Sequence, residues 1–243
     1  MILKIIYKSL SFFILVIVMY FFSCNTTPGY IPNGYKLVYS QTFDTEEAIY
    51  EFEFTEAGKW LINQEGNGSM ALEFTGNSEY QPEVSSPHII GLISELRFSS
   101  FVLEADLLQT GEEYGHRDMC LFFGFQDPAH FYYVHMATQT DEHAHNIFIV
   151  NNEPRTKIST KTTDGIDWGD NIWHKIRLVR NIEDGTVKLF FDDMDQPVME
   201  ARDKNFGEGY IGFGSFDDSG KIDNIKIWAS KVESKASGFF DKK

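Results

Sequence analysis

Short apolar or alternating runs separated by turn residues recur along the chain after residue 35, and they constrain its fold more than any other feature. The clearest pair is HKIRLVR (174–180) and TVKLFF (186–191), joined by NIEDG (181–185). Side chains alternate between the two faces of a strand, so such runs, with little helical periodicity, indicate β-strands. Gly185 supplies the positive φ that a tight hairpin needs. The pattern predicts an all-β protein.

The expected strands are bounded by Gly, Pro, Asn, Asp or Ser. They cover residues 36–43, 69–74, 92–98, 101–109, 118–126, 131–137, 147–151, 174–180, 186–191, 198–203, 209–216 and 223–228. A second turn, DDSG at 217–220, is expected to join the last two strands as a hairpin. Strands at this spacing predict a β-sandwich or jelly roll of two antiparallel sheets.

The N-terminus has the features of an export signal. Lys4 and Lys8 precede an apolar run over residues 10–22, which is short for a membrane span and typical of a signal peptide. The following Ser23-Cys24 resembles the lipobox of bacterial lipoproteins, in which the cysteine is acylated, for example with palmitate. An ordinary cleaved signal or an uncleaved anchor is the alternative.

These features divide the chain into a signal peptide (1–23), a polar tether (24–35), one β domain (36–229) and a C-terminal tail (230–243) that is expected to be frayed. About 200 residues in the mature part suffice for one domain with a substantial core. The lipobox resemblance implies a protein held on the outer membrane by its lipid, facing the periplasm or the cell surface.

Acidic residues outnumber basic ones by 36 to 21, a formal net charge of −15 that disfavours nucleic acid and anionic lipid surfaces as partners. The electrostatic field of a local pocket can differ from the net charge, and Arg117, Arg155 or Lys157 could line a basic pocket for an acidic sugar.

Only Cys24 and Cys120 are present, so acylation of the first leaves no disulfide partner. Cys120 lies in the apolar run CLFFGF and is expected to be a buried, unreactive thiol.

The C-terminal half resembles the concanavalin A-like lectin/glucanase superfamily, and within it the laminin-G-like and 3-keto-disaccharide-hydrolase-like domains. The segments that carry the resemblance are WHKIRLVR from Trp173, GTVKLFFDD from Gly185, and GYIGFGSFDDSGKIDNIKI from Gly209. It implies a concanavalin A-like jelly roll and a role with carbohydrates, since the superfamily includes binding modules, hydrolases and lyases. The glucanase motif Glu-x-Asp-x-x-Glu is incomplete here, because Gln109 replaces its last carboxylate.

The densest group of proton-transferring side chains lies in residues 116–146, which hold five of the seven histidines. Imidazoles titrate near neutral pH, so acid–base chemistry is expected here. Tyr133 and His135 share one face of their expected strand, because side chains alternate. The polar loop that follows can bring His143 or His145 over the same face.

These side chains suit an elimination reaction next to a uronic-acid carboxylate. Such a reaction needs a base, an acid, and a hydrogen-bond donor that neutralises the carboxylate. The assignments are His135 as the base, with His143 or His145 as alternatives, Tyr133 as the acid, and Arg117 with Asn146 on the carboxylate. The preferred function is therefore a carbon–oxygen lyase or oligosaccharide dehydratase of polysaccharide degradation. The alternatives are a 3-keto-disaccharide-type hydrolase and a non-catalytic glycan-binding lipoprotein.

Sugar-contacting residues are expected around the same face. They are His116, Asn146, Arg155 and Trp168, the last as an exposed stacking platform. Aromatic and polar groups of this kind equally suit a binding groove without catalysis.

No cofactor is expected to be required for catalysis. His143 and His145 with Asp141 offer metal ligands, but their spacing does not specify a tetrahedral site. A structural calcium ion is expected between Asp44 and Asp223, which offer hard oxygen ligands and match positions where jelly rolls of this type hold one.

Overall fold

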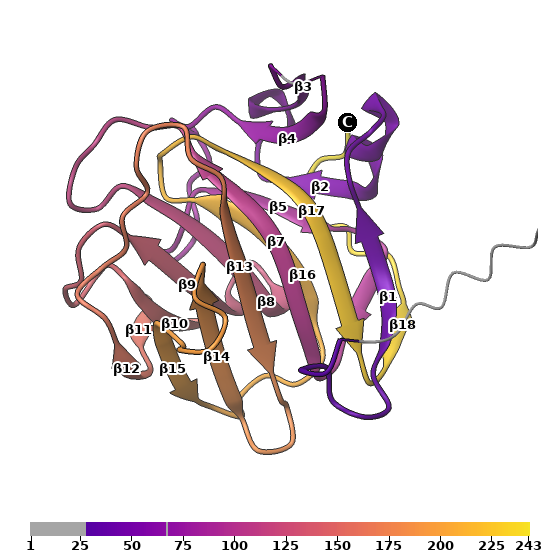
Figure 1. Cartoon of the computed structure of the whole chain (residues 1–243), viewed down its shortest axis with the longest axis vertical. Coiled ribbons are helices and arrows are strands. Elements are labelled where there is room, and N and C mark those ends of the chain that lie inside the picture. Colours follow the sequence, from indigo (N-terminus) through magenta and orange to yellow (C-terminus); the bar gives the residue numbers. More distant parts are fainter. Residues whose placement is uncertain (1–27, 67) are drawn as a thin grey trace, which may run out of the picture.

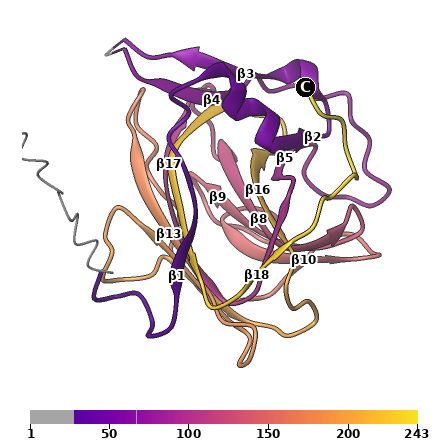
Figure 2. The same cartoon turned by 90° about the vertical axis from the view of Figure 1, so that its right-hand side faces the viewer.

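The computed structural model describes residues 28–66 and 68–243, which form an antiparallel β-sandwich (Figures 1 and 2). Its two large sheets face each other across one apolar core. Alternate residues of strands from both sheets fill that core, including Leu103 and Leu107 from one sheet and Leu121 and Phe123 from the other. No helix among the described residues is long and apolar enough to cross a membrane.

The larger sheet has nine strands in the described part of the chain. Its order is β12 (Ser159–Thr162), β15 (Met199–Arg202), β14 (Thr186–Phe191), β13 (His174–Arg180), β7 (Phe101–Gln109), β17 (Gly220–Ala229), β4 (Met70–Phe74) and β3 (Trp60–Gln64), with β1 (Lys36–Gln41) also paired to β17.

The second sheet contributes the face that carries the histidine-rich segment. Its order is β11 (Thr156–Lys157), β10 (Asn146–Asn151), β9 (His130–Ala137), β8 (Asp118–Asp127), β16 (Tyr210–Ser215), β5 (Ile89–Ile93) and β2 (Phe52–Phe54). A two-stranded sheet pairs β6 (Leu96–Phe98) with β18 (Val232–Ser234), and two short 3₁₀ helices, η1 (Glu46–Glu51) and η2 (Ala57–Lys59), complete the elements.

The all-β jelly-roll prediction is confirmed, and the expected hairpin at 181–185 is present. Gly185 has a φ of +82°, and β13 pairs with β14 from Ile176 opposite Phe191 to Arg180 opposite Val187. The expected strand over 92–98 was wrong, because the chain turns between β5 and β6, which belong to different sheets.

The expected hairpin at 217–220 was also wrong. The strand before it, β16, pairs with β8 and β5, whereas β17 pairs with β7, β1 and β4. The DDSG turn therefore carries the chain from one sheet to the other at the edge of the sandwich.

The C-terminal tail is ordered rather than frayed. β18 pairs with β6, and Asp241 pairs with Phe54. Phe239 and Phe240 pack on the outer face of the seven-stranded sheet, where the ring of Phe125 lies 5.7 Å and 6.0 Å from theirs.

The described end of the expected tether also packs against the domain. Ile31 is buried with Val102 and Trp228, and the guanidinium of Arg177 lies 3.6 Å from the ring centre of Tyr30. The predicted signal peptide and Cys24 lie outside the described residues.

Candidate functional site

The histidine-rich segment forms β8, β9 and β10, three neighbouring strands whose opposed residues share a face. Cys120 lies opposite His135, and His135 lies opposite Asn146. The next row is formed by Phe122, Tyr133 and Phe148. These side chains lie on the outer face of the seven-stranded sheet, away from the main core.

Tyr133 and His135 share this face as predicted, with ring centres 6.3 Å apart. The face is nevertheless covered. Tyr133 is fully buried and His135 is 4 % exposed. The ring of Phe216 lies 5.2 Å from that of His135, and the Arg155 guanidinium lies 4.2 Å from the centre of the Phe216 ring. Access to the two predicted catalytic groups therefore requires Phe216 and Arg155 to move.

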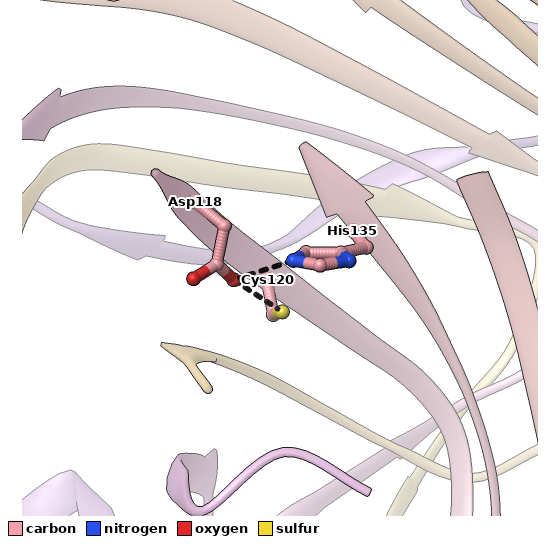
Figure 3. Close-up of side chains that lie close together, drawn as sticks. All are labelled: Asp118, Cys120 and His135. Carbon is pink, nitrogen blue, oxygen red and sulfur yellow. Dashed lines mark hydrogen bonds and ion pairs between the residues drawn. The ribbon is translucent and has the colours of Figure 1, made fainter. Parts of the chain in front are cut away.

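Both nitrogens of His135 face fixed neighbours. Nδ1 lies 3.0 Å from the His143 carbonyl oxygen, so an N–H on Nδ1 donates to it. Nε2 lies 3.1 Å from Asp118 Oδ2, close enough for an ion pair (Figure 3). Nε2 is buried and makes no well-aligned hydrogen bond, although the Asp118 carboxylate lies within reach.

Asp118 lies two residues before Cys120 on β8, on the same face. Its Oδ1 accepts a hydrogen bond of 2.6 Å from Ser215 Oγ, and its Oδ2 accepts one of 3.1 Å from Cys120 Sγ. Burial is the largest influence on the pKa of Asp118 and works to raise it, but the charge of His135 and the hydrogen bonds that the carboxylate accepts together outweigh burial and leave that pKa lowered. Burial and the Asp118 charge raise the pKa of Cys120, which fits the predicted buried thiol.

The structure does not bring Arg117 to this face. Its guanidinium is buried and donates to Gln109 Oε1 (2.6 Å) and to the Gly169 carbonyl (3.0 Å), with Glu113 3.4 Å away. Asn146 Nδ2 donates to the carbonyls of Asp141 (2.7 Å) and Ala144 (2.9 Å). These donors hold loops in place, and neither is free for a substrate carboxylate.

The remaining histidines of the segment that were predicted as site residues differ in their solvent exposure. His145 is fully buried, its Nε2 lies 2.9 Å from Thr163 Oγ1, and its Nδ1 accepts from the Ala137 N–H. Burial, with the charge of His135, lowers the pKa of His145 to about 4. The side chains of His143 and His116 are exposed, and His116 Nε2 lies 2.7 Å from Asp141.

The prediction of Trp168 as an exposed sugar platform was wrong. Trp168 is 1 % exposed, with its ring edge-on to His174 and Phe191 at 5.6 Å and 5.2 Å. The loop that carries it folds back on β13, where His174 Nε2 lies 3.0 Å from the Trp168 carbonyl.

An open cleft of about 470 Å³ lies beside the DDSG turn, and sequence reasoning missed it. We call it the Tyr114 cleft. It is lined by Thr75, Gly76, Asn77, Thr110, Gly111, Glu112, Tyr114, Asp217, Asp218 and Ser219. No local sequence pattern connects the acids of this turn to Tyr114, which lies about a hundred positions earlier.

Asp218 is the central polar group of the Tyr114 cleft. Its Oδ2 accepts hydrogen bonds from Tyr114 Oη (2.9 Å) and the Asp118 N–H (2.8 Å). Burial and the nearby Asp118 charge raise the pKa of Asp218 to about 7. Gly111 allows this packing, because a Cβ there would lie 2.8 Å from Asp218 Oδ1.

The two predicted calcium ligands line the same cleft. Asp44 and Asp223 line one cleft of about 460 Å³ with Asp106 and Trp173. Burial and the charges of Asp106 and Asp44 raise the pKa of Asp223 to about 6. Among the described residues, however, the groups of three ligands with donor atoms within 4.8 Å of one another lie elsewhere. They are Asp118, Cys120 and His135, and Asp118, Asp217 and Asp218.

No protein-family model and no curated protein sequence matches the chain. Solved structures with a similar fold include the carbohydrate-binding module CBM66 of Bacillus subtilis, with 17 % identity, a TM-score of 0.52, and 74 % of this chain and 96 % of the module covered. Domain 4 of AbnA, an extracellular arabinanase of Geobacillus stearothermophilus, was solved with arabinotriose and has 13 % identity, a TM-score of 0.52, and coverage of 80 % and 93 %.

The winged bean acidic lectin, solved with methyl-α-D-galactose, is also similar, with 15 % identity, a TM-score of 0.51, and coverage of 80 % of this chain and 99 % of the lectin. At these identities the likeness defines the fold alone. The chain is a jelly-roll β-sandwich of the kind found in lectins and carbohydrate-binding modules, as the concanavalin A-like prediction required.

Proposed function

We propose that the protein binds a saccharide and that the Tyr114 cleft receives it. The observation that carries this proposal is an aromatic ring, 44 % exposed, beside amide, hydroxyl and carboxylate groups in one cleft. Tyr114 offers an apolar ring face for the C–H face of a sugar, and Asn77, Thr110 and Asp218 offer hydrogen bonds to its hydroxyls.

The charges of the cleft favour a neutral sugar. Asp217, Asp218 and Glu112 line it, and no basic residue does among its lining residues. An acidic sugar would meet like charges, whereas neutral hydroxyls can donate to carboxylates. The fold neighbours support the same class, since two of them were solved with a neutral saccharide bound and a third is named a carbohydrate-binding module.

Calorimetry against neutral oligosaccharides, beginning with arabinotriose and methyl galactosides, tests the proposal. Tyr114→Ala and Asp218→Asn should each weaken binding at least about 5-fold, since each removes a contact worth about 1 kcal/mol or more. The matched control is Tyr50→Ala, because Tyr50 is 59 % exposed in η1 and does not line the cleft. Binding that survives both cleft variants would place the sugar elsewhere.

Elimination on uronate-containing glycans is the second candidate function. The observation that favours it is a set of buried polar atoms without hydrogen-bond partners, Tyr133 Oη, His135 Nε2 and Arg155 Nε, around one face. In this arrangement Tyr133 is the acid, His135 is the base, and Arg155 replaces Arg117 as the partner of the carboxylate.

Incubation with uronic-acid oligosaccharides tests the elimination candidate, because a conjugated unsaturated uronate absorbs in the ultraviolet and a hydrolysis product does not. Tyr133→Phe should lower turnover by at least about 100-fold, the usual effect of losing a general acid. New reducing ends without the absorbance would indicate hydrolysis, for which Asp217 and Asp218 supply two neighbouring carboxyl groups.

We also propose that the domain works on a membrane surface, held by a lipid on Cys24, in line with the lipobox resemblance. The packing of Tyr30 and Ile31 on the larger sheet leaves only a short segment between Cys24 and the folded domain. The saccharide would then be met close to the bilayer, on the periplasmic or outer side.

A further inference from the structure

We propose that Asp118, Cys120 and His135 bind a divalent transition metal ion, with zinc the best match to the ligand set. The site lies under Phe216 on the outer face of the seven-stranded sheet and goes beyond saccharide binding in the Tyr114 cleft. Figure 3 shows the three side chains converging from two neighbouring strands, Asp118 and Cys120 from β8 and His135 from β9.

The spacing of the donor atoms fits one ion. Asp118 Oδ2 lies 3.1 Å from Cys120 Sγ and 3.1 Å from His135 Nε2, and all three atoms lie within 4.8 Å of one another. Zinc bonds of about 2.0–2.3 Å at tetrahedral angles put neighbouring ligand atoms about 3.3–3.6 Å apart. The two contacts of Asp118 Oδ2 therefore need to lengthen by only a few tenths of an ångström to admit the ion, and the Sγ–Nε2 pair lies within 4.8 Å.

The surrounding contacts are those of a metal site. A metal-binding histidine usually donates its second ring N–H to a carbonyl or carboxylate, and His135 Nδ1 lies 3.0 Å from the His143 carbonyl. A coordinating carboxylate is usually held through its other oxygen, and Ser215 Oγ donates to Asp118 Oδ1 at 2.6 Å. Both contacts leave Nε2 and Oδ2 beside each other, 3.1 Å apart.

The independent observation is that buried His135 Nε2 makes no well-aligned hydrogen bond, although the Asp118 carboxylate lies 3.1 Å from it. Buried polar atoms are nearly always well paired, so a nitrogen in this position indicates a further ligand. Tyr133 Oη, two residues along the same strand face, is also buried and without a partner.

The ligand types select the metal. One thiolate, one imidazole and one carboxylate suit zinc and disfavour calcium or magnesium, which prefer oxygen ligands alone. On binding, the Cys120 S–H bond breaks and the Cys120 S–metal bond forms. A His135 that is protonated in its ion pair with Asp118 also loses its Nε2 proton as the N–metal bond forms. One proton leaves for neutral His135 and two leave for protonated His135, with no change of oxidation state.

This assignment and the elimination candidate exclude each other at one atom. A His135 Nε2 that coordinates a metal has no lone pair with which to accept a proton. Metal binding at His135 in the test below would therefore exclude His135 as the base of an elimination, while saccharide binding in the Tyr114 cleft is measured separately.

The experiment uses the full-length protein, stripped by a chelator and titrated with zinc or with cobalt(II) as a spectroscopic probe. We expect one ion per chain, release of one to two protons near pH 7 from Cys120 and His135, and a near-ultraviolet thiolate-to-cobalt charge-transfer band. Failure of the unaltered protein to bind zinc, or cobalt binding without a thiolate band, would overturn the proposal without any variant.

Variants then assign the ligands. Cys120→Ser should abolish the thiolate band, His135→Ala should abolish tight binding, and Ser215→Ala should weaken affinity about 10–100-fold as a lost supporting contact. His143→Ala is the matched control, since its exposed side chain is not a ligand. Asp217→Asn separates this site from the group Asp118, Asp217 and Asp218. Loss of binding in Asp217→Asn, with retention in Cys120→Ser, would place the ion in the acidic group instead.

Discussion

The Asp218 carboxylate accepts a hydrogen bond of 2.8 Å from the backbone N–H of Asp118. The Asp118 carboxylate accepts hydrogen bonds from Ser215 and Cys120, and one of its oxygens lies within 4.8 Å of the Asp218 carboxylate. One residue of β8 thus joins the open Tyr114 cleft to the covered outer face of the sheet. The two sites are electrostatically coupled, because the negative charge of Asp118 helps to raise the pKa of Asp218 to about 7.

This raised pKa predicts a pH dependence of stability. The folded chain holds the Asp218 proton more tightly than the unfolded chain, whose aspartates titrate near 3.8. The contribution is therefore fully present below about pH 4 and is lost as the pH rises through about 7. Asp218→Asn removes the titration, so its stability relative to the unaltered protein should improve between pH 5 and about pH 8.

Urea unfolding at several pH values measures this difference, with Asp217→Asn as the control because Asp217 is more exposed in the same turn. A difference between the Asp218 variant and the unaltered protein that stays constant across this range would mean that Asp218 titrates normally.

The C-terminal tail gives a second prediction, because its packing was not expected. Phe239 lies 5.7 Å from the rings of both Phe125 and Tyr210 and covers the outer face of the seven-stranded sheet. Phe239→Ala should lower the free energy of unfolding by about 1–3 kcal/mol, the usual range for losing a partly buried ring. Urea unfolding checks it, with Lys243→Ala at the exposed terminus as the control. An unchanged midpoint would mean that the tail does not stabilise the domain.

The parts of the fold that sequence could predict are those with a local cause. The strands Phe101–Gln109, His174–Arg180 and Thr186–Phe191 have the predicted bounds, because alternation and turn residues mark both ends. Phe52–Phe54 and Val232–Ser234 were missed, since three-residue strands exist only through their partners β5 and β6. The sheet that a strand joins also depends on residues distant in the sequence. For this reason the DDSG turn was wrongly predicted to form a hairpin, although it connects strands of two different sheets.

The same division applies to the site. Tyr133 and His135 were placed on one face correctly, because strand parity is local. Their burial was not foreseen, since Phe216 and Arg155 reach them from other segments. The hydrogen bond between Tyr114 and Asp218 could not be predicted either, because the two residues lie far apart in the sequence.

Calcium remains a prediction for the cleft that holds Asp44, Asp106 and Asp223. If the ion binds there, it should raise the melting temperature, since a ligand at 100 times its Kd stabilises the native state by about 2.7 kcal/mol. Differential scanning calorimetry with and without calcium, after chelation, measures the shift. Asp44→Asn should abolish it, and Asp217→Asn should not. An identical melting curve in calcium and in chelator would leave these residues as ordinary acids.

Lipid anchoring gives the last prediction. A single acyl chain holds a protein on a bilayer only marginally, whereas the several chains carried by a lipoprotein cysteine give stable attachment. Cys24→Ala should therefore move the protein from the membrane fraction to the soluble fraction. Cys120→Ala is the matched control, because Cys120 is buried in β8 and cannot carry a lipid there. Fractionation with metabolic labelling by palmitate reports both outcomes. Membrane association that survives Cys24→Ala, with no label on the unaltered protein, would show that the apolar segment itself is the anchor.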